Sequence, residues 1–179
     1  MEFEILDRET KYEGKVFNIV QDRIKYPDDR IARFDYIQHG GAVTILPIDE
    51  EGNIFYILQY RHPTGEILLE LPAGTLEKGE EPAYCAGREL QEEIGMAANN
   101  IELLGEFYLA PGYSSEYMYV FLATGLKPGK LPGDVDEYIE VEKCTVKEFY
   151  TKMEMGEIRD AKTYAVMAMA QKELAKYLD

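Results

Sequence analysis

The amino-acid sequence predicts a mixed α/β sandwich formed by one domain. Short runs rich in β-branched and aromatic residues occupy most of the chain, one amphipathic helix interrupts them, and helical patterns close the C-terminus. This order of strands, one helix, strands and then helices differs from the regular strand–helix alternation of a parallel α/β fold. A chain of 179 residues, 46% of them apolar, is long enough to bury one core.

The N-terminal half is predicted to form strands. Pro27 separates the first two runs with a turn, because proline presets the backbone angle that a turn needs. A second turn at 49–52 separates two further runs, which the sequence predicts as a hairpin with a buried partner. The five predicted strands cover residues 15–26, 30–39, 41–48, 53–61 and 66–74.

The clearest helical pattern spans residues 82–94. Its apolar residues recur at spacings of three and four, which places them in one narrow stripe: Ala83, Ala86, Leu90 and Ile94. Gly95 follows the last of them, and glycine is the residue that most often ends a helix. We therefore expect a helix with one buried stripe that ends before Gly95.

After this helix, three strands and two helices are predicted. The strands are expected over 101–110, 116–126 and 137–146, and a short helix over 147–156. Asp160 is a suitable N-cap for the final helix, because an aspartate accepts hydrogen bonds from the first free backbone N–H groups. The residues expected to face inward on this last helix are Tyr164, Met167, Ala170, Leu174 and Tyr177 or Leu178.

The charge of the chain excludes some classes of partner. With 19 basic and 34 acidic residues the net charge is −15, which disfavours duplex nucleic acid and anionic membranes. A phosphate-rich substrate is compatible only if divalent cations reverse the local charge. Cys85 and Cys144 fit no disulfide or metal-binding pattern, the N-terminus is charged from its second residue, and no apolar run reaches the roughly 18 residues of a membrane span. We therefore expect a soluble cytoplasmic protein.

The helix predicted at 82–94 carries an array of carboxylates. Glu89, Glu92 and Glu93 are three and four residues apart, so they lie within one turn beside the apolar stripe. Like charges at this spacing destabilise a helix by roughly 0.2–0.5 kcal/mol per pair, and a hard divalent cation with oxygen ligands would offset that repulsion. The other interpretation is a solvated acidic face, the commoner meaning of a glutamate-rich helix. Arg88 precedes Glu92 by four residues and is expected to pair with it.

The segment around this helix matches the signature of the Nudix hydrolase family at every defined position. The signature reads G-x5-E-x7-R-E-U-x-E-E-x-G-U, where U is a bulky aliphatic residue, and it is met by Gly74, Glu80, Arg88, Glu89, Leu90, Glu92, Glu93, Gly95 and Met96. The strand order also resembles the Nudix-type α/β/α sandwich with mixed β-sheets, here with an N-terminal antiparallel β extension. The resemblance implies hydrolysis of a nucleoside-diphosphate-linked substrate with Mg²⁺, or with Mn²⁺ as a substitute.

The resemblance also implies a role for each residue of this segment. Glu89 and Glu93 correspond to direct metal ligands, and Glu92 to a ligand or to a partner through water. The carbonyl of Ala73 corresponds to a further ligand, and Glu92 and Glu93 are placed among the catalytic residues. Structural roles are implied for the remaining positions: Gly74, where the backbone approaches closely, Glu80 and Arg88, which tie the loop to the helix, and Gly95.

Two further stretches resemble the ADP-ribose pyrophosphatase group of this family. Residues 59–74 resemble the run that precedes the signature in that group. Pro111 lies 15 residues after Met96, at a position that marks ADP-ribose enzymes, and it begins a loop similar to P-G-x-S-x-E. The resemblance implies substrate-binding roles for Arg61, Glu70, Pro111, Gly112, Ser114 and Glu116. For Arg61 two interpretations stay open, a contact with substrate phosphate and a surface ion pair.

An acidic loop at 134–140 resembles the late loop that brings a glutamate over the metals in ADP-ribose pyrophosphatases. Glu137 is the first choice for the residue that positions or deprotonates the attacking water, with Asp136 and Glu140 as alternatives. An acidic surface turn is an equally good interpretation of this stretch. The aromatic residue that stacks on adenine is left open among Tyr113, Tyr36 and Phe34.

The resulting hypothesis is a Mg²⁺-dependent ADP-ribose diphosphatase that releases AMP and ribose 5-phosphate, with related nucleoside diphosphate sugars as further substrates. The alternatives are hydrolysis of another sugar nucleotide, a flavin dinucleotide or a dinucleoside polyphosphate, and a Nudix-like module that binds a nucleotide without cleaving it. In this group the N-terminal strands commonly exchange across a homodimer, so the segment from Val16 to His39 is expected to help build the site of the neighbouring chain. Residues 1–40 are therefore expected to form a dimerisation element, and residues 41–179 the Nudix hydrolase domain.

Overall fold

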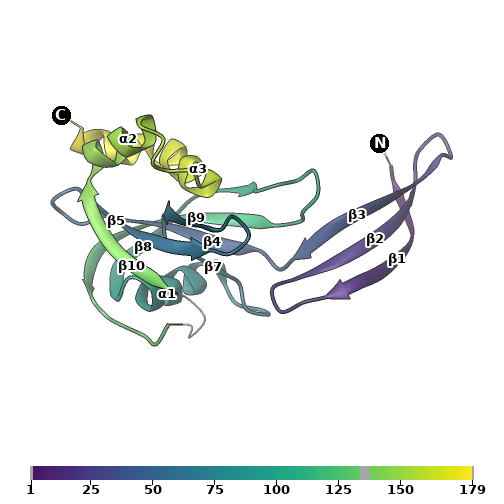
Figure 1. Cartoon of the computed structure of the whole chain (residues 1–179), viewed down its shortest axis with the longest axis horizontal. Coiled ribbons are helices and arrows are strands. Elements are labelled where there is room, and N and C mark those ends of the chain that lie inside the picture. The colour runs from purple at the N-terminus through teal and green to yellow at the C-terminus, as the bar shows by residue number, and fades with distance from the viewer. Residues whose placement is uncertain (1, 134–137, 179) are drawn as a thin grey trace.

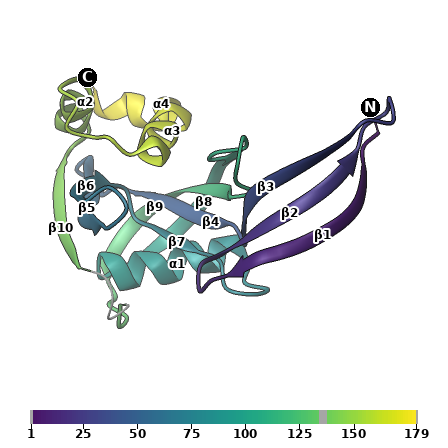
Figure 2. The same ribbon diagram turned by 45° about the vertical axis from the view of Figure 1, so that its right-hand side comes forward.

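The computed structural model describes residues 2–133 and 138–178, and it contains three β-sheets with helices on two sides. Helix α1 (Pro82–Glu93) covers one face of the body, and the C-terminal helices cover the opposite face (Figure 1). The N-terminal sheet extends to one side of this sandwich (Figure 2). The predicted α/β/α sandwich with mixed sheets and an N-terminal antiparallel extension is therefore confirmed.

The N-terminal sheet has three antiparallel strands in the order β1-β2-β3. The last two were predicted, whereas the first was missed because its side chains are almost all exposed and show no apolar alternation. Its strand is held by backbone pairing and by ion pairs across the sheet, such as that of Arg8 with the buried Asp22 at 2.7 Å. The strands are β1 (Glu4–Glu13), β2 (Phe17–Lys25) and β3 (Ile31–His39).

The body contains a four-stranded sheet in the order β7-β4-β9-β8 and a three-stranded sheet in the order β10-β5-β6. In the first sheet β4 runs parallel to β9, while every other pair in the two sheets is antiparallel. The strands are β4 (Ala42–Pro47), β5 (Asn53–Arg61), β6 (Glu66–Glu70), β7 (Ala73–Thr75), β8 (Met96–Tyr108), β9 (Tyr117–Pro128) and β10 (Ile139–Thr145).

The hairpin predicted from residues 41–61 is wrong. Strands β4 and β5 belong to different sheets and share one isolated bridge, between Ile48 and Ile54. All six residues of β4 are buried, as in a central strand with neighbours on both edges and layers on both faces. The run at 66–74 also divides, at Leu71 and Pro72, into β6 of one sheet and β7 of the other.

Helix α1 forms where it was predicted, but Ala83, which was expected in the buried stripe, is exposed, and Cys85 is buried instead. Its buried residues include Cys85, Ala86 and Leu90, which pack in one core cluster with Val43 and Phe121 of the central strands. Gly95 follows with a φ of 70°, the left-handed conformation in which a side chain would be strained. The helix therefore packs on the central strands through one face and ends before the glycine that the sequence places there.

The C-terminal helices close the other side of the core. Asp160 caps α3 as predicted, since its carboxylate accepts a hydrogen bond from the Thr163 N–H at 2.9 Å. Met167 and Leu174 are buried as predicted, but Tyr164 is 40% exposed and its hydroxyl donates to the Met153 carbonyl instead. The short helix expected over 147–156 forms as α2 (Val146–Glu154). The final helix, expected as one, divides at Ala170 into α3 (Ala161–Met169), α4 (Gln171–Leu174) and a short 3₁₀ helix (Ala175–Tyr177).

Two core clusters fill the sandwich. One lies between α1 and the sheets, and the other lies under α2, α3 and α4, where Phe149 and Leu174 are fully buried. No helix in residues 2–133 and 138–178 is long and apolar enough to cross a membrane.

Candidate functional site

Arg88 joins the acidic residues of the segment around α1. Its guanidinium donates to both carboxylate oxygens of Glu80, from Nε at 2.9 Å and from Nη2 at 3.0 Å. Its Nη1 donates to Glu89 at 2.7 Å and to Glu92 at 2.8 Å, the pairing that the spacing predicted. One partly buried cation therefore bridges the loop before the helix to two carboxylates on the helix.

These contacts change the pKa of Glu80, the carboxylate in the loop before α1. The hydrogen bonds from Arg88 lower the pKa of Glu80 to about 2, against the opposing effect of burial. Glu80 and its neighbours in turn raise the pKa of Arg88. Burial raises the pKa of the nearby Cys85 thiol well above its ordinary value, so this cysteine stays protonated. The segment is thus an ionised network around a neutral thiol.

Gly74 and Ala73 bring the β7 backbone against two buried glutamates of α1. The Ala73 N–H donates to Glu93 Oε2 at 2.9 Å. The Glu89 carboxyl group fills the space where a side chain at Gly74 would begin. Glu89 and Glu93 are 9% and 7% exposed, which is unusual for acidic residues without a strong reason. The backbone of β7 therefore lies against both carboxylates, Glu93 at Ala73 and Glu89 at Gly74.

The donors gathered here have the chemistry of a site for a hard divalent cation. They are carboxylate oxygens and a backbone carbonyl, which are the ligands that Mg²⁺ and Mn²⁺ prefer. In the described parts of the chain, no three acidic, histidine or cysteine side chains already converge as a ready ligand set. Arg88 instead occupies part of the space between Glu89 and Glu92. The residue types fit such a cation, because the carboxylate oxygens of Glu89 and Glu93 lie against the same short backbone segment, residues 73 and 74.

A cavity of about 700 Å³ lies beside this segment. It is lined by several residues that the sequence predicted for the site: Arg61, Ala73, Gly74, Ser114 and Glu116. The N-terminal extension contributes apolar wall through Val16, Phe17 and Ile37, and α3 contributes Lys162. The cavity wall therefore combines apolar side chains with two basic ones and two acidic ones: Arg61, Lys162, Glu116 and Asp160.

Other predicted residues lie around this cavity rather than on its wall. Glu70 is 1% exposed and pairs with Arg61 and Lys162, which line the cavity. Glu92, Glu93 and Gly95 line a second hollow of about 400 Å³. Glu80, Arg88 and Glu89 form the network described above.

The loop that begins at Pro111 is attached to the N-terminal sheet. The Ile37 N–H donates to the Tyr113 carbonyl at 2.8 Å, and the Ser115 N–H donates to the Ile37 carbonyl at 2.9 Å. The His39 N–H donates to the Ser115 hydroxyl oxygen at 3.0 Å. A hollow of about 250 Å³ lies between this loop and the sheet. It is lined by Pro111, Gly112, Ser114 and all three candidates for adenine stacking, Phe34, Tyr36 and Tyr113.

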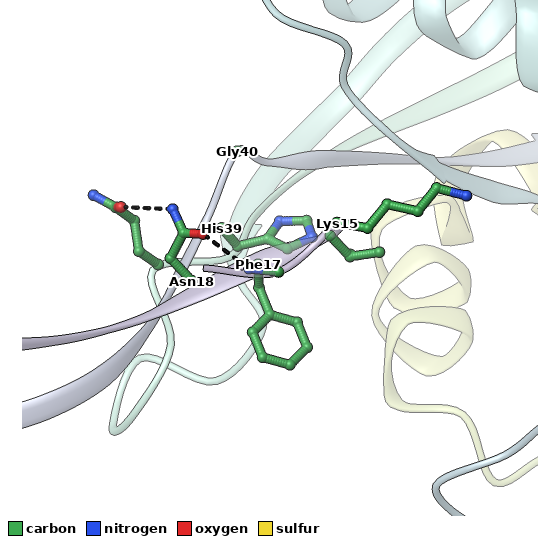
Figure 3. Close-up of a pocket in the computed structure, with 8 residues that line it drawn as sticks. Lys15, Phe17, Asn18, His39 and Gly40 are labelled. Atoms are coloured by element: carbon green, nitrogen blue, oxygen red, sulfur yellow. Dashed lines mark hydrogen bonds between the residues drawn. The ribbon is translucent and has the colours of Figure 1, made fainter. Parts of the chain in front are cut away.

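A further hollow of about 390 Å³ lies where the extension joins the body. Figure 3 shows Phe17 and Asn18 of β2 beside His39 and Gly40 at the end of β3. Asn18 accepts a hydrogen bond from the Gly14 N–H at 3.3 Å, which holds the turn before β2. Because Phe17 and His39 also line the 700 Å³ cavity, the extension forms part of the wall of the site in its own chain.

Lys162 is a charged residue of the cavity wall that sequence reasoning missed. Lys162 lies in the first turn of α3, is 8% exposed, and pairs with the buried Glu70 and with Asp160. Arg61 binds the same glutamate through two hydrogen bonds of 2.8 and 2.7 Å. The sequence feature that could have identified Lys162 is its position two residues after the N-cap Asp160. A lysine is unusual there, because the positive end of the helix dipole opposes a cation.

The acidic loop predicted to position the attacking water is described only in part. Glu137 and Asp136 lie outside the described residues. Glu140 lies on β10, is exposed, and accepts a hydrogen bond from the Tyr138 hydroxyl at 3.0 Å.

Comparison with known proteins places these features in a wider context. Residues 38–167 match the model of the NUDIX domain. The chain is 36% identical to an ADP-ribose pyrophosphatase of Bacillus subtilis (strain 168), over 97% of this chain and 95% of that one. It is 42% identical to an ADP-ribose pyrophosphatase of Mycobacterium tuberculosis (strain ATCC 25618 / H37Rv), over 70% of this chain and 61% of that one. A crystal structure of an ADP compounds hydrolase has the same fold, with a TM-score of 0.85 and 23% identity over 98% of this chain and 96% of the other.

Proposed function

Because the chain belongs to the Nudix family, we propose that it hydrolyses the diphosphate bond of ADP-ribose, giving AMP and ribose 5-phosphate. The observation that supports this most is the 700 Å³ cavity, which joins basic side chains, an apolar wall and the backbone that holds Glu89 and Glu93. Near full-length similarity to an ADP-ribose pyrophosphatase supports the choice of substrate. Related nucleoside diphosphate sugars are proposed as further substrates.

The proposed cofactor is Mg²⁺, with Mn²⁺ as a substitute. Glu89, Glu93 and Glu92, with the carbonyl of Ala73, are the residues that would hold it. When bound, such a cation neutralises diphosphate charge and lowers the pKa of a coordinated water. This chain has a net charge of −15, so the neutralisation by a cation is needed to offset the repulsion between the protein and a small anionic substrate.

The chain's own groups have separate roles in the proposed reaction. Arg61 lines the cavity with its side chain partly exposed, and Glu70 fixes the plane of its guanidinium, so it is ready to orient a phosphate group. Ser114 and Glu116 line the same cavity, which supports the proposed role of both residues in substrate binding. The proposed water-positioning residue is Glu137, with Asp136 and Glu140 as alternatives, and Glu92 and Glu93 complete the catalytic set.

The N-terminal residues 1–40 are proposed to join two chains as a homodimer, with residues 41–179 as the hydrolase domain. The three-stranded sheet supports this because it exposes apolar side chains that a single chain leaves in water, among them Ile5, Ile19 and Ile31. Light scattering of the Ile5→Glu/Ile31→Glu variant is the test, and a monomer is expected where the unmodified chain gives a dimer. An unmodified chain that is monomeric at all concentrations would refute the proposal.

The decisive test of function is product analysis with equal concentrations of several substrates. We expect AMP and ribose 5-phosphate from ADP-ribose in the presence of Mg²⁺, and no release after chelation by EDTA. A preference for another sugar nucleotide, a flavin dinucleotide or a dinucleoside polyphosphate would replace ADP-ribose by that substrate. Tight binding of ADP-ribose without AMP release would instead identify a nucleotide-binding module, although every glutamate of the signature is present.

The proposed location is the cytoplasm. Cys85 and Cys144 are both free thiols, which is the usual state in a reducing compartment. Fractionation of the cells that produce the protein tests this, and recovery outside the cytoplasm would contradict it.

A further inference from the structure

We propose that His39 is a substrate-binding residue, whose Nε2–H donates to an oxygen of the bound nucleoside diphosphate. This inference rests on the proposed function for the identity of the substrate. His39 is the last residue of β3, outside the signature segment and outside the Pro111 loop. It lines both the 700 Å³ cavity and the 390 Å³ hollow beside it (Figure 3).

The first argument comes from the hydrogen bonds of the imidazole ring. The Gly41 N–H donates to His39 Nδ1 at 3.1 Å. A ring nitrogen that accepts a hydrogen bond carries no proton, so the proton of the neutral ring is on Nε2, which is therefore a donor. Among the residues that the structure describes, none accepts a hydrogen bond from Nε2, and this nitrogen is not enclosed by the protein either. Nε2 is therefore open to the space that His39 lines.

The second argument concerns the choice of histidine at this position. Gly41 has a φ of 96°, in the left-handed region, and its N–H turns back to the side chain two residues earlier. Asparagine and aspartate are the side chains that usually accept a hydrogen bond of this kind. The turn by itself therefore does not require an imidazole. What histidine adds is a second nitrogen, which lies across the ring from the turn.

The third argument is that this donor is held in place. The His39 N–H donates to the Ser115 hydroxyl oxygen at 3.0 Å, and the same hydroxyl donates to the His39 carbonyl at 3.4 Å. His39 also pairs with Phe17 across β2 and β3. Because Gly41 holds the ring itself, the imidazole cannot turn without losing a hydrogen bond. A donor that is fixed before the ligand arrives loses little conformational entropy on binding, which favours affinity.

The fourth argument is the position of His39 relative to the proposed metal site. Ala42, which follows the turn, pairs with Thr75 of β7. The backbone of β7 lies against the carboxylates of Glu89 and Glu93. All three residues of β7 line the same cavity as His39. A nucleoside diphosphate held near those carboxylates therefore meets a wall that includes the imidazole.

The test measures the affinity for α,β-methylene-ADP with Mg²⁺ present, because the methylene bridge prevents hydrolysis and leaves binding alone. His39→Asn keeps an acceptor for the Gly41 N–H but has no atom at the position of Nε2. We expect it to weaken binding roughly ten- to a hundredfold, as the loss of a hydrogen bond to a charged group does, with an unchanged unfolding temperature. The matched control is His62→Asn, at the other histidine of the chain, which is exposed between β5 and β6 and should leave the affinity unchanged.

The complementary substitution separates a contact with substrate from a purely structural role. His39→Gln places an amide nitrogen near the position of Nε2, whereas its oxygen lies one carbon too far to replace Nδ1 as the acceptor for the Gly41 N–H. We expect most of the affinity to remain while the unfolding temperature falls. A residue that only held the turn would give the opposite result, with full affinity in His39→Asn and a loss in His39→Gln. That result would overturn the inference.

The same measurements distinguish a failure of this inference from a failure of the proposed function. Full affinity in both His39 variants refutes the assignment of His39, and so does an unmodified chain that does not bind the analogue. A chain that binds the analogue through His39 but releases no AMP from ADP-ribose refutes the proposed function alone.

Discussion

The carboxyl group of Glu89 lies where the first side-chain carbon of residue 74 would be, so Gly74 is required by its neighbour rather than by its own backbone angles. The same β7 segment donates the Ala73 N–H to Glu93 at 2.9 Å. The strand and the helix therefore fix each other through two carboxylates, and the first prediction follows from this contact.

Gly74→Ala should displace Glu89 and lower kcat/KM for ADP-ribose roughly a hundredfold, because a misplacement of about 1 Å in a catalytic group has costs of that order. Steady-state kinetics with Mg²⁺ measure it. The matched control is Gly40→Ala, whose added carbon would meet only the Leu76 carbonyl oxygen at 3.9 Å. Full activity of Gly74→Ala would show that the carboxylate of Glu89 moves freely.

Glu93→Gln should remove activity while the protein stays folded. The amide oxygen can still accept from the Ala73 N–H, but the side chain no longer supplies a negative charge for a cation. We expect kcat to fall roughly a hundred- to a thousandfold, with an unchanged unfolding temperature. Glu81→Gln, an exposed glutamate just before α1, is the control. Turnover near that of the unmodified chain in Glu93→Gln would exclude Glu93 as a metal ligand.

Arg88→Lys should destabilise the fold even though it keeps the charge. A lysine cannot reproduce the planar fork that binds both oxygens of Glu80 and reaches Glu89 and Glu92. The expected loss in the free energy of unfolding, measured in urea, is about 2 kcal/mol. The control is Arg30→Lys, at an exposed arginine that pairs with Asp28 and lies over the Tyr26 ring, and it should change stability by less than about 0.5 kcal/mol. Equal losses for the two variants would contradict this explanation.

The low pKa of Glu80 predicts how its contribution to stability depends on pH. Since the folded chain holds this pKa at about 2 rather than 4.5, the contribution is complete above about pH 4.5 and is lost as the pH falls toward 2. Glu80→Gln should therefore be less stable than the unmodified chain by about 2 kcal/mol at neutral pH. The difference should shrink in acid. Urea unfolding at several pH values measures it, and a difference that is the same at every pH would argue against an ionised Glu80.

The sequence predicted those parts of the fold that depend on interactions between residues close together in the chain. The apolar stripe of α1 and the glycine that ends it are both set by neighbours within one helix, and Asp160 caps α3 through a local contact. The signature around α1 was equally readable, because its residues contact one another over short distances in the chain, as Arg88 does with Glu80 and Glu92.

The features that sequence reasoning missed depend on partners far away in the chain. The runs at 41–48 and 53–61 look like a hairpin, yet β4 pairs with β7 and β9 because the core needs a buried central strand there. Strand β1 lacks an apolar pattern and exists through its pairing with β2. Lys162 contacts Glu70 across 92 positions of sequence, and no local pattern reports such a contact.

The attachment of the Pro111 loop to β3 has a consequence for how such a protein changes over generations. The loop is held by backbone hydrogen bonds of Ile37 and by Ser115, whereas the carboxylates of α1 are held by Arg88 and β7. A substitution in the extension therefore changes the part of the cavity wall that β2 and β3 contribute, whereas the hydrogen bonds that hold the α1 carboxylates come from other elements. We expect substrate preference to change through the extension more readily than the chemistry at α1 does.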